Sequence, residues 1–127
     1  KKLSEDTTLK SRLLEMEAQG LEMVLHGYTH DGSIWSNDNV DKASVINDIT
    51  KGYREMKDFQ NYKYLVTPNG ANSEMIKTVA KRFSPCLVSA WEGVNKRESA
   101  DKYDLGRYWM TNHTLEEFKT VIVRFKT

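Results

Sequence analysis

Apolar residues recur along this chain at spacings that predict helices and short strands in alternation. Leu9, Leu13 and Met16 fall on one helical face. Gly20 ends that pattern, so a first helix is predicted before it. Residues 21–25 are mostly apolar and too few for another helix, and we expect them to form a buried strand.

Three further helices are predicted from the same helical spacing. One covers about residues 40–59, one begins at Asn72 or Ser73, and the last begins at Thr114. Glu117 stands three residues after Thr114, which is the spacing of a capping box. The apolar residues that these helices are expected to bury are Val45, Ile49, Tyr53, Met56, Met75, Ile76, Val79, Ala80, Phe83, Phe118, Val121, Ile122 and Phe125.

Further strands are predicted between these helices, at residues 62–67, 86–90 and 103–110. Helices and strands thus alternate, and parallel strands need connections of that length to return to the same sheet edge. The sequence therefore predicts an α/β fold with parallel βα units in a single domain, residues 1–127. The polar residues 26–39 are too many for a tight turn and are predicted to form a functional loop.

The charge balance narrows the classes of partner. Nineteen Lys and Arg against eighteen Asp and Glu give a net charge of +1, so the chain has no electrostatic signature of nucleic-acid or anionic-membrane binding. No apolar run approaches the roughly 20 residues that cross a bilayer, and no membrane span is predicted. Neutral partners such as glycans stay open. The single cysteine, Cys86, excludes an internal disulfide and is predicted to be buried.

Two of the three histidines, His26 and His30, stand four residues apart where the strand at residues 21–25 gives way to the loop. In an extended strand they would lie about 13 Å apart, too far to share an ion held about 2.1 Å from each nitrogen. Gly27 allows the chain to curl, and the carboxyl end of a parallel strand is where α/β proteins place ligands. The pair is therefore a candidate metal site.

The pair has two other interpretations. Zinc peptidases also space two histidines by four, but on a helix and with a Glu base where this chain has Gly27, so we reject that class. The imidazoles could instead form only hydrogen bonds within the loop. Asp31, directly after His30, has two equal interpretations, as a turn residue or as a partner of the site. His113 is expected to be a surface loop residue.

Residues 15–30 resemble the second motif of the NodB-type polysaccharide deacetylases, carbohydrate esterase family four, in which a helix ends in a glycine and a strand leads to two histidines four apart. Residues 64–71 are similar to the third motif, a strand ending in a Pro-x-Gly turn that lines the substrate groove. The arginine usual upstream of that proline is missing. Residues 87–95 and 103–107 resemble later stretches of divergent members, and Arg107 is a candidate replacement for the arginine, as an orienting residue.

The resemblance implies part of a (β/α)7 barrel and a metal-dependent hydrolase that removes N-acetyl or O-acetyl groups from a polysaccharide. It implies Zn²⁺ or a similar ion on His26, His30 and an aspartate. The motif with the base and that aspartate is expected before Lys1, and the motif with the acid histidine after Thr127. It also suggests a secreted or cell-envelope setting. Candidate contacts to an acetylated polysaccharide are Pro68, Asn69, Gly70, Tyr28 and Trp91.

Several alternatives stay open at this point. The chain could be a non-catalytic, degenerate deacetylase module with a structural or glycan-binding role in a surface or phage tail assembly. It could also be a plain metal-binding domain whose third ligand is one of Asp31, Asp38, Asp41 and Glu92. Trp35, like Tyr28 and Trp91, is either a core aromatic or a stacking surface for a sugar. An incomplete sheet has open edges, so association with flanking domains or other chains is expected.

Overall fold

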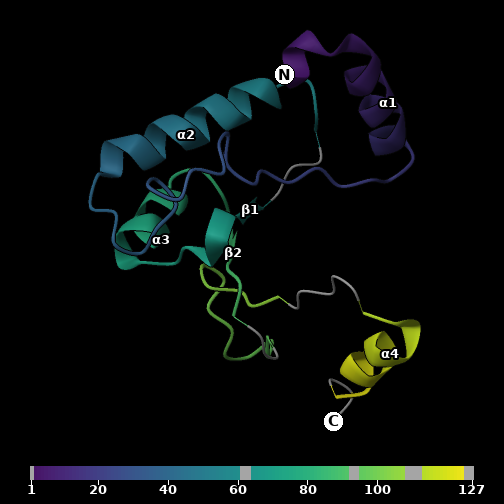
Figure 1. The fold of residues 1–127 in the computed structure, drawn as a ribbon, viewed down its shortest axis with the longest axis vertical. Helices are drawn as coiled ribbons and strands as arrows, with labels where there is room; N and C mark the ends of the chain where they lie inside the picture. Colours follow the sequence, from purple (N-terminus) through teal and green to yellow (C-terminus); the bar gives the residue numbers. More distant parts are fainter. Residues whose placement is uncertain (1, 61–63, 92–94, 108–112, 125–127) are drawn as a thin grey trace.

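The computed structural model describes residues 2–60, 64–91, 95–107 and 113–124. The long helix α2 lies above a small parallel sheet, and α3 lies beside the sheet (Figure 1). The elements are η1 (Leu3–Glu5), α1 (Thr7–Ala18), α2 (Lys42–Glu55), β1 (Leu65–Val66), η2 (Pro68–Gly70), α3 (Glu74–Ala80), β2 (Leu87–Val88) and α4 (Leu115–Arg124). None of the described helices is both long and apolar enough to span a bilayer.

The helices begin where polar side chains can satisfy their first backbone N–H groups. The carboxylate of Asp6 accepts from Leu9 N at the start of α1, and Asp41 accepts in the same way at the start of α2. The Ser73 hydroxyl accepts from Ile76 N at the start of α3. These caps confirm the predicted helices and place their first turns, because each satisfies a donor that the helix itself leaves free.

The sheet runs parallel and adds its segments in chain order. β1 pairs with β2, Leu25 forms a parallel bridge with Leu65 of β1, and Leu105 forms one with Val88 of β2. The spatial order is therefore Leu25, β1, β2, Leu105. This arrangement, with α2 and α3 in the first two connections, confirms the predicted α/β class.

The regular strands are shorter than the sequence predicts. Of residues 21–25, only Leu25 pairs and is buried, whereas Leu21 and Val24 are exposed, so a buried strand over the whole run is wrong. Among its described residues, the predicted strand at 103–110 forms a β-bridge at Leu105, and the backbone of Arg107 adds a hydrogen bond to Trp91 O. Residues 61–63 and 108–112 lie outside the described part. A strand is defined by its partners as well as by its apolar content, and single-sequence patterns do not report the partners.

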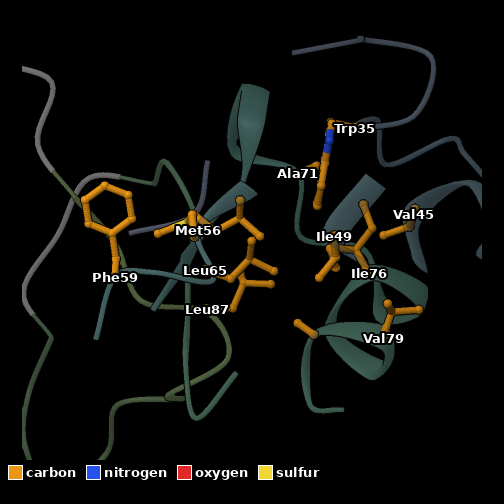
Figure 2. Close-up of a cluster of buried hydrophobic side chains, with 12 residues drawn as sticks. Trp35, Val45, Ile49, Met56, Phe59, Leu65, Ala71, Ile76, Val79 and Leu87 are labelled. Atoms are coloured by element: carbon orange, nitrogen blue, oxygen red, sulfur yellow. The ribbon is translucent and has the colours of Figure 1, made fainter. Parts of the chain in front are cut away.

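The core lies between the sheet, α2 and α3. Val45 and Ile49 of α2 pack toward Ile76 and Val79 of α3, and Leu65 of β1 lies with Leu87 of β2 beside Met56 (Figure 2). Gly52 brings α2 close to the sheet, because a Cβ there would collide with the side chain of Leu25. The glycine in the predicted helix is thus a point of close approach between helix and strand.

Helix α4 departs from the prediction in its packing. Its capping box is present, with Glu117 accepting from Thr114 N and Thr114 Oγ1 accepting from Glu117 N. The apolar side is not buried as expected, because Phe118 is 45% and Ile122 41% exposed, and the helix stands away from the sheet (Figure 1). Phe125 lies outside the described residues. A cap specifies where a helix begins and not what it packs against.

Candidate functional site

The two histidines of the predicted metal site lie side by side at the carboxyl end of the Leu25 segment. The ring centroids of His26 and His30 are 5.2 Å apart, with an interplanar angle of 63°. Both residues are exposed. The chain curls between them at Gly27, whose φ of +74° lies in the left-handed region that glycine adopts at little cost.

A backbone carbonyl of the neighbouring strand fixes the ring of His26. The Nδ1 atom of His26 lies 2.9 Å from the carbonyl oxygen of Val66 in β1. A carbonyl only accepts hydrogen bonds, so Nδ1 carries the proton in this contact. In the neutral imidazole Nε2 is then the atom with the free lone pair. Metal-ligating histidines are commonly held through their second ring nitrogen in this way.

The buried carboxylate of Asp48 in α2 accepts hydrogen bonds from four donors, three of them in the histidine loop. Tyr28 N donates to Oδ2 at 2.8 Å, and Thr29 N to Oδ1 at 3.1 Å. The hydroxyl of Thr29 donates to Oδ1 at 2.6 Å, and the indole Nε1 of Trp35 to Oδ2 at 2.9 Å. One side chain therefore ties the backbone between the two histidines to a helix of the core.

Gly27 has close neighbours in addition to its positive φ. A Cβ at this position would come within 2.9 Å of Trp35 Nε1 and 3.0 Å of Pro68 Cγ. Trp35 is completely buried, which excludes it as a stacking surface for a sugar and corrects that possibility. Pro68, the first residue of η2, is also buried and packs against the histidine loop at Gly27.

The remaining predicted contact residues near the loop differ in accessibility. Asn69 is exposed, has a φ of +55°, and donates from its side chain to Trp35 O at 3.4 Å. Gly70 lies against Ala90, because a Cβ there would be 2.5 Å from Ala90 Cβ. Tyr28 is half-buried. The turn of η2 therefore joins the histidine loop to the end of β2.

Asp31 has the geometry of a turn residue. Its Oδ1 accepts from Ser33 N at 2.8 Å and from Ser33 Oγ at 2.7 Å. These hydrogen bonds lower the pKa of the exposed Asp31 carboxyl below its ordinary value. The turn interpretation of Asp31 accounts for these contacts.

A second group of polar residues lies at the carboxyl ends of β2 and the Leu105 segment. The indole Nε1 of Trp91 donates to Asp104 O at 2.7 Å, and a Cβ at Gly106 would lie 2.7 Å from its ring. Trp91 is nevertheless 40% exposed. The indole is thus held in place on one side and open to solvent elsewhere. Arg107 Nε donates to Ser89 O at 3.1 Å, which anchors the guanidinium stem at the same edge.

Asp104 ties this group together. Its Oδ1 accepts from Ser89 Oγ at 2.7 Å and from Asn72 Nδ2 at 3.1 Å, and Oδ2 lies 3.4 Å from Lys77 Nζ. Burial alone raises the pKa of Asp104, but the hydrogen bonds and the charge of Lys77 outweigh it, so the pKa lies below its ordinary value. The network links α3 to the last sheet segment.

The donor set suits a borderline divalent ion such as Zn²⁺ in kind, since both histidines offer imidazole nitrogens. In residues 2–60, 64–91, 95–107 and 113–124, however, no group of three or more His, Cys, Asp and Glu side chains could hold an ion. Asp31, Asp38 and Asp41 therefore do not complete a site with the pair, and Glu92 lies outside the described residues. Among the described residues, the pair by itself therefore offers two imidazole nitrogens and no third ligand.

Asp48 was not singled out from the sequence, although a signal for it exists. The buried side of α2 consists of Val45, Asp48, Ile49 and Gly52, so a carboxylate occupies a position in an otherwise apolar helical stripe. Buried carboxylates in proteins are held by hydrogen bonds or charges. An Asp at such a position therefore predicts a cluster of donors opposite it.

Comparisons of the chain with protein families, with curated proteins and with solved structures gave no match. The resemblance to NodB-type deacetylases therefore rests on the motif residues themselves.

Proposed function

We propose that this chain is part of a metal-dependent hydrolase that removes N-acetyl or O-acetyl groups from a polysaccharide. His26 and His30 are two ligands of its divalent ion, most simply Zn²⁺, and a further ligand comes from outside the described residues. The observation that carries the proposal is the convergence of two exposed imidazoles, 5.2 Å apart between centroids, at the carboxyl end of a parallel sheet segment.

The hydrogen bond to Val66 supports the assignment of His26. With the proton on Nδ1, the lone pair of Nε2 is free to coordinate an ion, and metal-ligating imidazoles are commonly held in this way. A divalent ion bound there would supply Lewis acidity toward water and the acetyl carbonyl oxygen. The task of the chain's own residues is to hold two neutral imidazoles together and open to solvent.

The sheet order supports the finer fold proposal. Leu25, β1, β2 and Leu105 are adjacent in space in the order in which they occur in the chain, all parallel. A (β/α)7 barrel adds its strands in that manner, and the candidate residues all follow strand ends, as ligands of such folds do. We therefore propose that the four segments are one arc of a deacetylase barrel.

The glycan would contact the same edge of the sheet. Trp91 offers a partly exposed indole held by Asp104 O and Gly106, and a fixed aromatic ring suits stacking on a sugar. Tyr28 lies within the histidine loop and Asn69 lies beside that loop, and both complete the proposed contact surface. Arg107, anchored on Ser89 O, is the proposed orienting residue.

The indole also favours a second candidate, a non-catalytic glycan-binding module of a larger assembly. Such a module needs only the aromatic surface, whereas the hydrolase needs the metal ligands as well. The two candidates differ in what His26→Ala removes: acetate release in the hydrolase, and nothing measurable in a binding module.

The test measures acetate release from N-acetylglucosamine oligomers by full-length protein supplied with Zn²⁺ or Co²⁺. The variants are His26→Ala and His30→Ala, and His113→Ala is the matched control, because it removes an exposed histidine from another segment. We expect acetate release to fall by more than about 100-fold in the two loop variants and to be unchanged in the control. Equal release by wild type and His26→Ala would overturn the hydrolase proposal.

A further inference from the structure

We propose that Asp48 is the positioning residue of the histidine loop, and that its carboxylate, from inside the core, keeps the rings of His26 and His30 converged. The inference rests on the proposed function for its consequence in metal binding. Its structural part concerns the protein without metal and can be tested separately.

The hydrogen bonds are placed where they control the loop. Only three residues separate the histidines, and the backbone N–H groups of two of them, Tyr28 and Thr29, both point at the Asp48 carboxylate. Successive N–H groups converging on one anion form a compact nest that fixes the backbone angles of the segment. The curl after Gly27 is thus fixed at its next two residues by one side chain.

Asp48 is buried, and both oxygens of its carboxylate accept hydrogen bonds. The residue is only 3% exposed, and among the described residues no Lys or Arg forms an ion pair with it. Burying an ionised carboxylate is costly unless hydrogen bonds replace its water. Both oxygens are therefore committed to the loop, with Tyr28 N and Trp35 Nε1 on Oδ2 and two donors of Thr29 on Oδ1.

A neutral replacement of the same shape cannot reproduce these hydrogen bonds. In Asp48→Asn one oxygen becomes an NH₂ group, which would face at least one backbone N–H of the loop instead of accepting from it. The loop would then have to move to relieve the mismatch, and the backbone between the histidines would move with it. Removing the outer support of a metal-ligating histidine typically costs 10–100-fold in metal affinity.

The experiment compares wild type with Asp48→Asn and with Val79→Ala, which removes buried volume from α3 and leaves the hydrogen bonds of the loop in place. The metal-free readout is the nuclear Overhauser effect between the ring protons of His26 and His30. The second readout is Co²⁺ affinity by absorption titration. We expect Asp48→Asn to show no Overhauser effect between the rings and to bind Co²⁺ at least about tenfold more weakly. Val79→Ala should keep the effect and bind Co²⁺ within about threefold of wild type.

The outcomes separate the two proposals. An Overhauser effect and a Co²⁺ affinity that are both unchanged in Asp48→Asn would overturn the positioning role and leave the proposed function in place. If the effect disappears in Asp48→Asn and the full-length wild-type protein binds no Co²⁺, the positioning role is supported and the proposed function is overturned. If Asp48→Asn does not fold, Thr29→Val removes one donor from the same carboxylate. An unchanged result for that exposed variant overturns the inference as well.

Discussion

Gly52 of α2 lies so close to Leu25 that a Cβ atom at position 52 would come within 2.4 Å of Leu25 Cδ1. The helix that carries Asp48 is thereby held against the sheet segment that leads into His26. The histidine loop and the Asp48 carboxylate are consequently positioned relative to each other by one close contact between α2 and the Leu25 segment.

Substituting Gly52 should therefore destabilise the protein. In an exposed helix Gly→Ala gains about 1 kcal/mol, but here the added methyl overpacks against the buried Leu25, which typically costs about 1–3 kcal/mol. We expect Gly52→Ala to lower the urea midpoint of unfolding. Lys51→Ala, at the neighbouring exposed position of α2, is the control and should leave the midpoint unchanged. A rise for Gly52→Ala would contradict the close packing.

Two loop glycines should respond differently to the same change. Gly27 has a positive φ, and a Cβ there would meet Thr29 O at 2.8 Å. At Gly32 the nearest atom to such a Cβ is Asn69 Nδ2 at 3.8 Å. We expect Gly27→Ala to cost about 1–3 kcal/mol of unfolding free energy and Gly32→Ala almost none, measured by urea unfolding. Equal effects would show that the curl tolerates a side chain.

Stability below neutral pH should depend on Asp104. Its folded pKa is depressed, so its contribution is present above the unfolded pKa of about 3.9 and is lost as the pH falls through the folded value. We expect the unfolding free energy of wild type to fall more steeply than that of Asp104→Asn between about pH 5 and pH 2. Asp38→Asn, an exposed carboxylate, is the control. Parallel curves for wild type and Asp104→Asn would contradict the network.

Cys86 should be unreactive in the folded protein. Burial raises the pKa of its thiol, and the opposing charge of Lys102 is the smaller effect. The thiolate is the reactive form, so both access and ionisation are unfavourable. We expect Ellman's reagent to label Cys86 at least about 100-fold more slowly in buffer than in urea. Rapid labelling in buffer would place the thiol at the surface.

The sequence was informative where the physics is local. Ser73 and Thr114, at the predicted helix starts, cap their helices through hydrogen bonds within three residues, and the curl at Gly27 follows from the backbone freedom of glycine. The α/β class could be predicted from the alternation of spacings. Cys86 is buried as predicted.

The remaining features depend on interactions between distant residues, which a single sequence does not specify. Leu21 and Val24 have the character of strand residues, yet pairing reaches only Leu25. The sequence of α4 identifies its apolar side but not the surface against which that side would pack. Asp48 lies nineteen and twenty residues from the two amides that it binds, so these hydrogen bonds depend on the packing of α2 against the loop.

The hydrogen bond between His26 and Val66 joins two positions forty residues apart. The tautomer of this exposed imidazole thus depends on a hydrogen bond to β1, which is distant in the sequence. Separation of β1 from the Leu25 segment would break the hydrogen bond from His26 Nδ1–H to Val66 O. The neutral ring could then exchange between its two tautomers. The nitrogen chemical shifts of this one side chain can therefore serve as a reporter of whether that edge of the sheet is closed.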